Sequence, residues 1–137
     1  MLKKFEINKV VKIVSGGDSG QDSIYRGLCA VEDYCKDKGE ENAVVLIHDG
    51  VRPLIVDETI TRNIEKVHEK GSAITVVPAI ETFVIQKEEG QMVIPDRSSC
   101  LLARAPQSFY LKDILSIHKK RNKSKIGNYY FYSILVL

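Results

Sequence analysis

The chain has 137 residues, a length that suits one domain with a hydrophobic core. Its apolar content of 44% and charged content of 28% are those of an ordinary globular protein. The 20 Lys and Arg residues nearly balance 18 Asp and Glu, for a net charge of +2. This balance argues against a nucleic-acid partner, which needs a concentrated basic face. The basic run at 119–125 is interpreted as a solvated helix end or tail.

Cysteine usage and hydropathy indicate the compartment. Cys29, Cys35 and Cys100 form no CxxC pair and no metal-ligand spacing, which favours reduced thiols in a cytosolic protein. The first residues lack the apolar core of a signal peptide, and no segment approaches the roughly 18 apolar residues of a membrane span. We therefore expect a cytoplasmic protein without a membrane partner.

The first predicted elements are a strand and a helix joined by glycines. The β-branched run at 9–14 predicts the strand, and the Gly-rich segment 15–20 predicts a turn. Asp22 or Ser23 is the predicted N-cap of the helix, which Gly39 ends. One apolar face at helical spacing is predicted for this helix, formed by Ile24, Leu28, Val31 and Cys35.

Two strands and a second helix follow. The uninterrupted apolar run at 43–47 predicts a strand buried on both faces, and 73–77 predicts the next strand. Between them, Asp57 is the predicted N-cap of a helix that ends at Gly71. This alternation predicts an α/β fold with a mainly parallel sheet. The buried stripe expected on the second helix is Ile60, Ile64 and Val67.

The second half of the chain departs from this alternation. Runs at 82–86 and 92–94 flank the polar segment 87–91 and predict a β-hairpin, either a dimer contact or a plain surface hairpin. Residues 111–120 predict a third helix. The aromatic and aliphatic tail 125–137 is either a final strand or a non-native terminus.

Glycines and polar residues in the first turn form one candidate site. Gly16 and Gly17 would let backbone amides approach a ligand, with Asp18 and Ser23 supplying polar groups near a helix N-terminus. The alternative is a tight turn with a capping Ser, which the turn alone favours. The G-x-G-x-x-G spacing of dinucleotide-binding proteins is absent.

Charged residues directly after the 43–47 strand form a second candidate site. Ligands bind beyond the carboxyl ends of strands in open α/β sheets. There Asp49 can hold a divalent cation and Arg52 can bind a phosphate. An internal ion pair is the alternative, but we favour function because a carboxylate beside a buried strand is costly without a task. His48 is interpreted as a structural hydrogen-bonding residue.

Two later segments carry further polar groups. Residues 78–82 follow a strand and include Thr82, and 94–98 include Arg97. The segment 104–109 is expected to be a loop with a second Arg, so two guanidiniums and two prolines could hold a phosphate. Taken singly, each segment also fits an ordinary polar turn. The sequence has no Ser-His-Asp arrangement, H-x-x-x-H pair or Walker loop.

In order and spacing, these four clusters resemble the cytidylyltransferases of methylerythritol phosphate and ribitol phosphate. The family's turn, strand end, post-strand segment and Arg-to-PQ-x-F loop match Gly16-Gly17 to Ser23, Val45 to Pro53, Pro78 to Thr82, and Arg97 to Phe109. The resemblance covers 11–120, and the last segment leans toward the polyol-phosphate branch.

The resemblance implies a Rossmann-like nucleotidyltransferase fold with a protruding hairpin arm. It implies transfer of CMP from CTP to a polyol phosphate, ribitol 5-phosphate or methylerythritol 4-phosphate, with release of pyrophosphate. It also implies Mg²⁺ and a homodimer formed through the arm. The residues carried over are Gly16, Gly17, Asp18 and Ser23 for cytosine and ribose, Asp49 for catalysis and the metal, Arg52 for catalysis and the acceptor, and Thr82 and Arg97 for the acceptor.

Several departures from the family accompany the resemblance. Its Gly-rich triphosphate loop, its later helix, and its terminal strand with a second metal-binding carboxylate and a catalytic Lys have no counterpart here. Ala105 replaces a hydroxyl residue and Gly20 a basic one. We therefore expect residues 1–137 to be one partial domain, with an arm at 79–97 and a poorly matched tail at 121–137. Such a fragment would have little activity alone. The alternatives are a non-catalytic remnant serving dimerisation or nucleotide binding, and an unrelated α/β domain.

Overall fold

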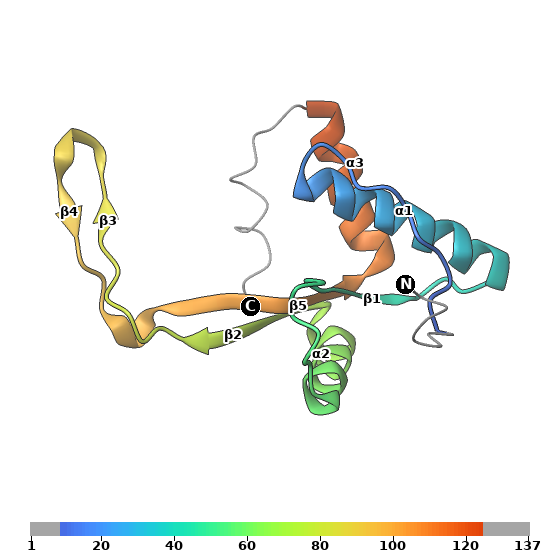
Figure 1. The fold of residues 1–137 in the computed structure, drawn as a ribbon, viewed down its shortest axis with the longest axis horizontal. Helices are drawn as coiled ribbons and strands as arrows, with labels where there is room; N and C mark the ends of the chain where they lie inside the picture. Colours follow the sequence, from blue (N-terminus) through green and yellow to red (C-terminus); the bar gives the residue numbers. More distant parts are fainter. Residues whose placement is uncertain (1–8, 125–137) are drawn as a thin grey trace. The chain divides into compact units, whose positions relative to one another are not determined.

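The computed structural model describes residues 9–124, which form two compact units (Figure 1). The first unit holds residues 9–45 and 110–124, and the second holds 46–109. No helix within 9–124 is long and apolar enough to cross a membrane. The elements are α1 (Gly20–Lys38), β1 (Val44–Ile47), α2 (Asp57–Lys70), β2 (Ser72–Pro78), β3 (Ile85–Gln86), η2 (Glu88–Gly90), β4 (Met92–Val93), η3 (Arg97–Ser99), β5 (Leu101–Tyr110) and α3 (Leu111–Ser124).

Helix α1 begins one turn earlier than the sequence predicted. Its N-cap is Ser19, whose hydroxyl oxygen accepts a hydrogen bond from the Asp22 amide at 3.1 Å. The predicted caps Asp22 and Ser23 are therefore wrong, because both lie inside the first helical turn. The end of the helix is confirmed: Gly39 adopts φ 67°, and its amide donates to the carbonyls of Cys35 and Lys36.

The core of the first unit lies between α1 and α3, which is the predicted third helix. From α1 it takes Leu28 and Cys35. Val31, which the sequence predicted on the same apolar face, is 36% exposed. His118 on α3 is fully buried, and its ring stacks on Tyr25 with centroids 5.8 Å apart. Other buried members of the core are Val45, Leu111, Ile114 and Leu115.

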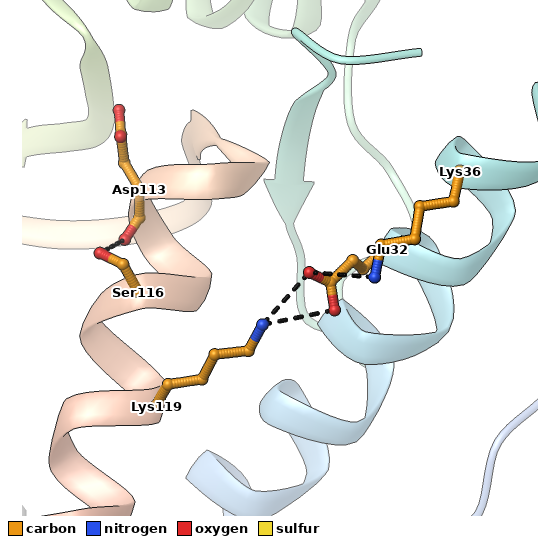
Figure 2. Close-up of polar contacts among 5 residues, drawn as sticks. All are labelled: Glu32, Lys36, Asp113, Ser116 and Lys119. Atoms are coloured by element: carbon orange, nitrogen blue, oxygen red, sulfur yellow. Dashed lines mark hydrogen bonds and ion pairs between the residues drawn. The ribbon is translucent and has the colours of Figure 1, made fainter. Parts of the chain in front are cut away.

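An ion-pair network links the same two helices at their surface (Figure 2). Lys119 on α3 donates to both carboxylate oxygens of Glu32 on α1, at 3.2 and 3.4 Å. Lys36 lies 3.5 Å from the same carboxylate. The hydrogen bond from Lys119 holds the pKa of Glu32 below its ordinary value, and the same bond raises the pKa of Lys119. The contact therefore stabilises the unit while both groups are charged.

Glu32→Gln is expected to lower the urea midpoint of the chain at pH 7. A carboxyl whose pKa is depressed by folding contributes stability above its unfolded pKa and loses it as pH falls through the folded pKa. Because folding raises the pKa of Lys119, the stability that this ion pair contributes is lost on the alkaline side only as pH rises through that folded pKa. Unfolding curves of both proteins at pH 7 and at about pH 3 check this. An equal difference at both pH values would contradict it.

The predicted strand at 9–14 is wrong. These residues form no strand in the described part of the chain, and their apolar side chains are exposed, with Ile13 at 73%. A β-branched run prefers extended backbone, but it becomes a strand only where a neighbouring strand supplies hydrogen bonds. Propensity alone therefore misled the prediction at this segment.

The strands β1, β5 and β2 form a three-stranded sheet in the order β1-β5-β2. The α/β class is confirmed, but β5 runs antiparallel to β2, and the predicted loop at 104–109 is wrong because it lies in β5. The connection explains the direction, since a parallel return needs a crossover and β2 reaches β5 through a hairpin arm. In β1 only Val45 is buried, so the expected burial of this strand on both faces is wrong. The reason is that β1 is an edge strand of the described sheet.

Helix α2 starts where the sequence predicted but with a different cap. Asp57 is the first helical residue, and the N-cap position belongs to Val56, which makes no side-chain capping bond. The stop is confirmed, because Gly71 adopts φ 85° and its amide donates to Val67 at 2.8 Å. Val67 is fully buried and Asn63 is 7% exposed, whereas the other predicted stripe positions are half-buried.

A buried polar network joins α2 to β2 and β5. The Asn63 side-chain amide donates to the Thr59 carbonyl at 2.9 Å and to the Thr75 hydroxyl at 3.1 Å. Thr75 donates to the Pro106 carbonyl at 2.8 Å, and Ser108 donates to Asn63 Oδ1 at 3.0 Å. The β2–β5 register shifts between Ile74 and Thr75, opposite the stretch that contains Pro106. The network thus satisfies polar groups at a bulge, where a strand proline is tolerated.

The predicted hairpin is present as the paired strands β3 and β4 (Figure 1). Ile85 pairs with Val93 and Gln86 with Met92, so the strands are shorter than predicted. At the base of the arm, the Ala79 amide donates to the Cys100 carbonyl at 3.0 Å. The single domain over 1–137 stays a prediction, and the predicted tail at 125–137 lies outside the described residues.

Candidate functional site

The Gly-rich turn of the first unit is held by side chains of α1. The Gly17 amide donates to the Ser23 hydroxyl oxygen at 2.9 Å, and that hydroxyl donates to the Ser19 carbonyl at 3.0 Å. Arg26 donates to the Gly16 carbonyl at 2.6 Å. Ser23 therefore bridges the turn and the helix. A serine does cap the helix, as the alternative interpretation of the turn expected, but it is Ser19 and not Ser23. Asp18 is exposed on the same turn.

Close backbone approach explains one of the two glycines. A Cβ on Gly17 would lie 2.3 Å from the Asp22 Cβ and 3.0 Å from the Asp22 carbonyl carbon, so no side chain fits without movement of the helix start. A Cβ on Gly16 would meet only the Ser23 Oγ, at 3.2 Å. The turn thus requires glycine at position 17, because the start of α1 packs against the side where a side chain would lie.

Gly17→Ala is expected to destabilise the first unit by about 1–3 kcal/mol, because the added methyl overlaps backbone and Cβ atoms of α1. Gly27→Ala is the matched control, since a Cβ there meets nothing within 4 Å and alanine favours a helix. Urea unfolding of both variants checks the pair. A Gly17→Ala protein as stable as the parent chain would contradict the packing argument.

The segment after β1 forms a turn closed by charged side chains. Arg52 Nε lies 3.0 Å from Asp49 Oδ2, and the Arg52 amide donates to the Asp49 carbonyl at 3.0 Å. His48 Nε2 lies 2.7 Å from the Arg52 carbonyl, and because a carbonyl only accepts, Nε2 carries the hydrogen. His48 is thus a hydrogen-bonding residue of the turn, as predicted. The turn fixes Asp49 and Arg52 at the strand end.

The exposure of this ion pair decides what it can do. The side chains of Asp49 and Arg52 are 55% and 50% exposed, so solvent screens their attraction and each can turn to a ligand at small cost. Within 9–124 no three His, Cys, Asp or Glu side chains gather around a potential metal position. An exposed carboxylate such as Asp49 can give one oxygen ligand to Mg²⁺, an ion that commonly takes its other ligands from water and phosphate.

A second polar pair lies at the base of the hairpin arm. Arg97 Nη2 donates to the Thr82 hydroxyl at 3.1 Å, which joins the two predicted acceptor residues across the arm. Asp96 caps η3, and the backbone hydrogen bond from Ser98 lowers the pKa of the Asp96 carboxyl. That cap sets the position of the Arg97 backbone. Arg97 thus keeps further guanidinium donors for an anionic ligand.

The structure brings the predicted residues together in three groups. Gly16, Gly17, Asp18 and Ser23 share the turn before α1 in the first unit, while the second unit holds the Asp49–Arg52 and Thr82–Arg97 pairs. Sequence reasoning missed Arg26, although it lies one helical turn after Ser23, and Asp96, although Asp before Arg-Ser-Ser is a capping signal. In the two groups of the second unit, Arg52 and Arg97 supply guanidinium donors of the kind that bind phosphate.

Comparison with known proteins adds an independent finding. The sequence profile of IspD, 2-C-methyl-D-erythritol 4-phosphate cytidylyltransferase, matches residues 1–129. Ribitol-5-phosphate cytidylyltransferase of Vibrio parahaemolyticus serotype O3:K6 is 53% identical over 121 residues, which cover 88% of this chain and 49% of that protein. 2-C-Methyl-D-erythritol 4-phosphate cytidylyltransferase of Clostridium botulinum strain Loch Maree is 37% identical over 124 residues, 90% of this chain and 51% of that protein.

The fold agrees with the sequence matches. The crystal structure of 4-diphosphocytidyl-2C-methyl-D-erythritol synthase from Anaerococcus prevotii is similar with a TM-score of 0.73 and 26% identity. That similarity covers 85% of this chain and 48% of the solved chain. The chain thus spans about half the length of the curated relatives it matches.

Proposed function

The chain belongs to the 2-C-methyl-D-erythritol 4-phosphate cytidylyltransferase family, and we propose that it serves the transfer of CMP from CTP to a polyol phosphate. The observation that carries this proposal is the ion pair Asp49–Arg52 together with the hydrogen bond Arg97–Thr82. All four residues stand in segments by which the sequence resembles the family. Ribitol 5-phosphate is the proposed acceptor, because the relative at 53% identity bears that name and the methylerythritol-phosphate relative is 37% identical.

The proposed reaction is a substitution at the α-phosphorus of CTP. A phosphate oxygen of the acceptor forms the new bond, and the bond from the α-phosphorus to the bridging oxygen breaks, so pyrophosphate leaves. Arg52 and Arg97 bind the acceptor phosphate through guanidinium N–H groups, and the Thr82 hydroxyl orients Arg97. Catalysis of this type depends on positioning and on neutralising charge.

The nucleotide is assigned to the first unit and the metal to Asp49. The residues Gly16, Gly17, Asp18 and Ser23 would bind cytosine and ribose, since they stand at the positions by which the turn resembles the family. Mg²⁺, when bound, neutralises charge on the triphosphate. Asp49 would supply its protein ligand and would then exchange its contact with Arg52 for the metal.

Partners and compartment complete the proposal. Both strands of the hairpin arm expose apolar side chains, which favours burial against a second copy in a homodimer. The cysteine pattern supports a cytoplasmic location. The exposed arm residues are Phe83, Val84, Ile85, Met92, Val93 and Ile94.

The direct experiment incubates the chain with CTP, Mg²⁺ and either ribitol 5-phosphate or methylerythritol 4-phosphate. Pyrophosphate release and ³¹P NMR of the diphosphate product measure turnover, and calorimetry measures acceptor binding. Faster turnover of ribitol 5-phosphate supports the proposal. Binding without turnover supports the second candidate, a non-catalytic binding or dimerisation module. Neither binding nor turnover of either acceptor overturns the proposal.

A further inference from the structure

The peptide group between Gly16 and Gly17 is held from both ends by side chains of α1. Its carbonyl, on Gly16, accepts a hydrogen bond from the Arg26 guanidinium at 2.6 Å. Its amide, on Gly17, donates to the Ser23 hydroxyl oxygen at 2.9 Å. Ser23 and Arg26 are three positions apart in α1, so both lie on one face of the helix. That face therefore bonds the acceptor and the donor of a single peptide group.

A peptide between two glycines depends on such bonds for its orientation. With no Cβ on either side, the group can rotate about its flanking bonds with little steric resistance. Rotation would turn the Gly16 carbonyl away from Arg26 and the Gly17 amide away from Ser23, so both hydrogen bonds would be lost together. The Ser23 hydroxyl is itself oriented, because it donates to the Ser19 carbonyl at 3.0 Å. The two bonds thus select one orientation of the peptide.

The segment before the turn packs loosely on α1. Residues 10–16 are exposed and form no strand in the described part of the chain. A hollow of about 330 Å³ lies where this segment passes the helix, and its lining includes Arg26, Lys12 and Ser15. Because packing there is incomplete, the orientation of the turn depends on its hydrogen bonds to α1.

We propose that Arg26 is a positioning residue for the nucleotide, because it fixes the Gly16–Gly17 peptide in the orientation that the ligand meets. The inference rests on the proposed function, which assigns cytosine and ribose to this turn. Arg26 lies three residues beyond Ser23, where the segment that resembles the family ends. In this role the guanidinium stays on the Gly16 carbonyl and contributes no bond to the phosphates of the ligand.

Cytidine separates this role from attraction between charges, since it has the base and the ribose but no phosphate. We expect Arg26→Ala to weaken the binding of cytidine and of CTP with Mg²⁺ by the same factor, roughly tenfold, because the binding-competent orientation becomes a minor one. NMR titrations measure both affinities. Without ligand, the Gly17 amide should exchange with water at least about fivefold faster in the variant. Exchange of the Leu28 amide, inside α1, checks that the helix stays folded.

Arg62→Ala is the matched control. It removes the same charge from α2, where the Arg62 side chain is 75% exposed and lies 3.6 Å from the Glu58 carboxylate. Because the contacts of this side chain are exposed and remote in sequence from the turn, the variant should keep both affinities and Gly17 exchange within about twofold of the parent chain.

The two measurements decide the inference together. Faster Gly17 exchange with an equal loss of affinity for cytidine and CTP supports it. Unchanged exchange in Arg26→Ala overturns it, and so do faster exchange with unchanged affinities and weaker binding of CTP alone, which would assign Arg26 to the phosphates. A parent chain that binds neither ligand rejects the proposed function and with it the nucleotide role of Arg26. Failure of the inference alone is distinct, because the parent chain then binds both ligands.

Discussion

Asp49→Asn is expected to lower CMP transfer at least about 100-fold. The substitution keeps the shape of the side chain but removes the charge that contacts Arg52 and that would hold Mg²⁺. A neutral amide is a weaker ligand for a hard dication than a carboxylate, so charge on the triphosphate would be less well neutralised. Pyrophosphate release with ribitol 5-phosphate, measured with protein in excess over CTP because a partial domain is expected to react slowly, gives the ratio of parent to variant.

Asp57→Asn is the matched control for this change. Asp57 is exposed at the first turn of α2 and lies in none of the three site groups. The Asp57→Asn variant should turn over substrate within about twofold of the parent chain. Its free energy of unfolding should fall by roughly 0.5 kcal/mol, because the favourable contact of a negative charge with the helix dipole is lost. A second readout is the affinity for Mn²⁺ in the presence of CTP, which Asp49→Asn should weaken even where turnover is slow. Unchanged Mn²⁺ affinity and turnover in Asp49→Asn would contradict the metal assignment.

Asn63→Ala is expected to destabilise the second unit by about 2–4 kcal/mol. The Asn63 side chain satisfies Ser108, Thr75 and the Thr59 carbonyl, and Ser108 is fully buried. Removing it leaves buried polar groups without their partner and a small cavity beside β5. Urea unfolding monitored by circular dichroism measures the loss.

Two further variants sharpen that measurement. Thr61→Ala removes an exposed hydroxyl that donates to the Asp57 carbonyl on the same helix, and it should cost less than about 0.5 kcal/mol. Ser108→Ala with Asn63→Ala closes a double-mutant cycle, in which the double variant should be less destabilised than the sum of the single variants. Additive losses would show that Ser108 and Asn63 do not act together.

Local features of the sequence accounted for most element positions. The stops at Gly39 and Gly71 were predictable because a left-handed residue after a helix strongly favours glycine. The strands at 43–47 and 73–77 were predictable because each is an apolar run between turn signals. The N-caps were less accessible, since Ser19, Asp22 and Ser23 all have capping side chains and only backbone geometry selects one.

The candidate site was likewise predictable only in part: its residues could be named from the sequence, but their contacts could not. The polar residues at 16–18, 49–52, 82 and 97 were recognisable from the sequence because they follow strands or lie in loops with a family's spacing. Their contacts were not. Thr82 and Arg97 are 15 positions apart, and only the fold of the hairpin arm brings the hydroxyl to the guanidinium. Arg26 bonds to the Gly16 carbonyl, a contact that no sequence motif predicts, whereas Asp96 carried a capping signal that sequence reasoning missed.

The sequence by itself determined the α/β class, the C-terminal ends of α1 and α2, and the residue types of the site, because these depend on turn chemistry, periodicity and spacing over a few neighbours. Tertiary structure decided the strand at Leu101–Tyr110 and the absence of one at 9–14. A strand exists only through its partner: β5 contains Pro106 and still pairs with β2 across a bulge, whereas the β-branched run at 9–14 has no partner strand within 9–124.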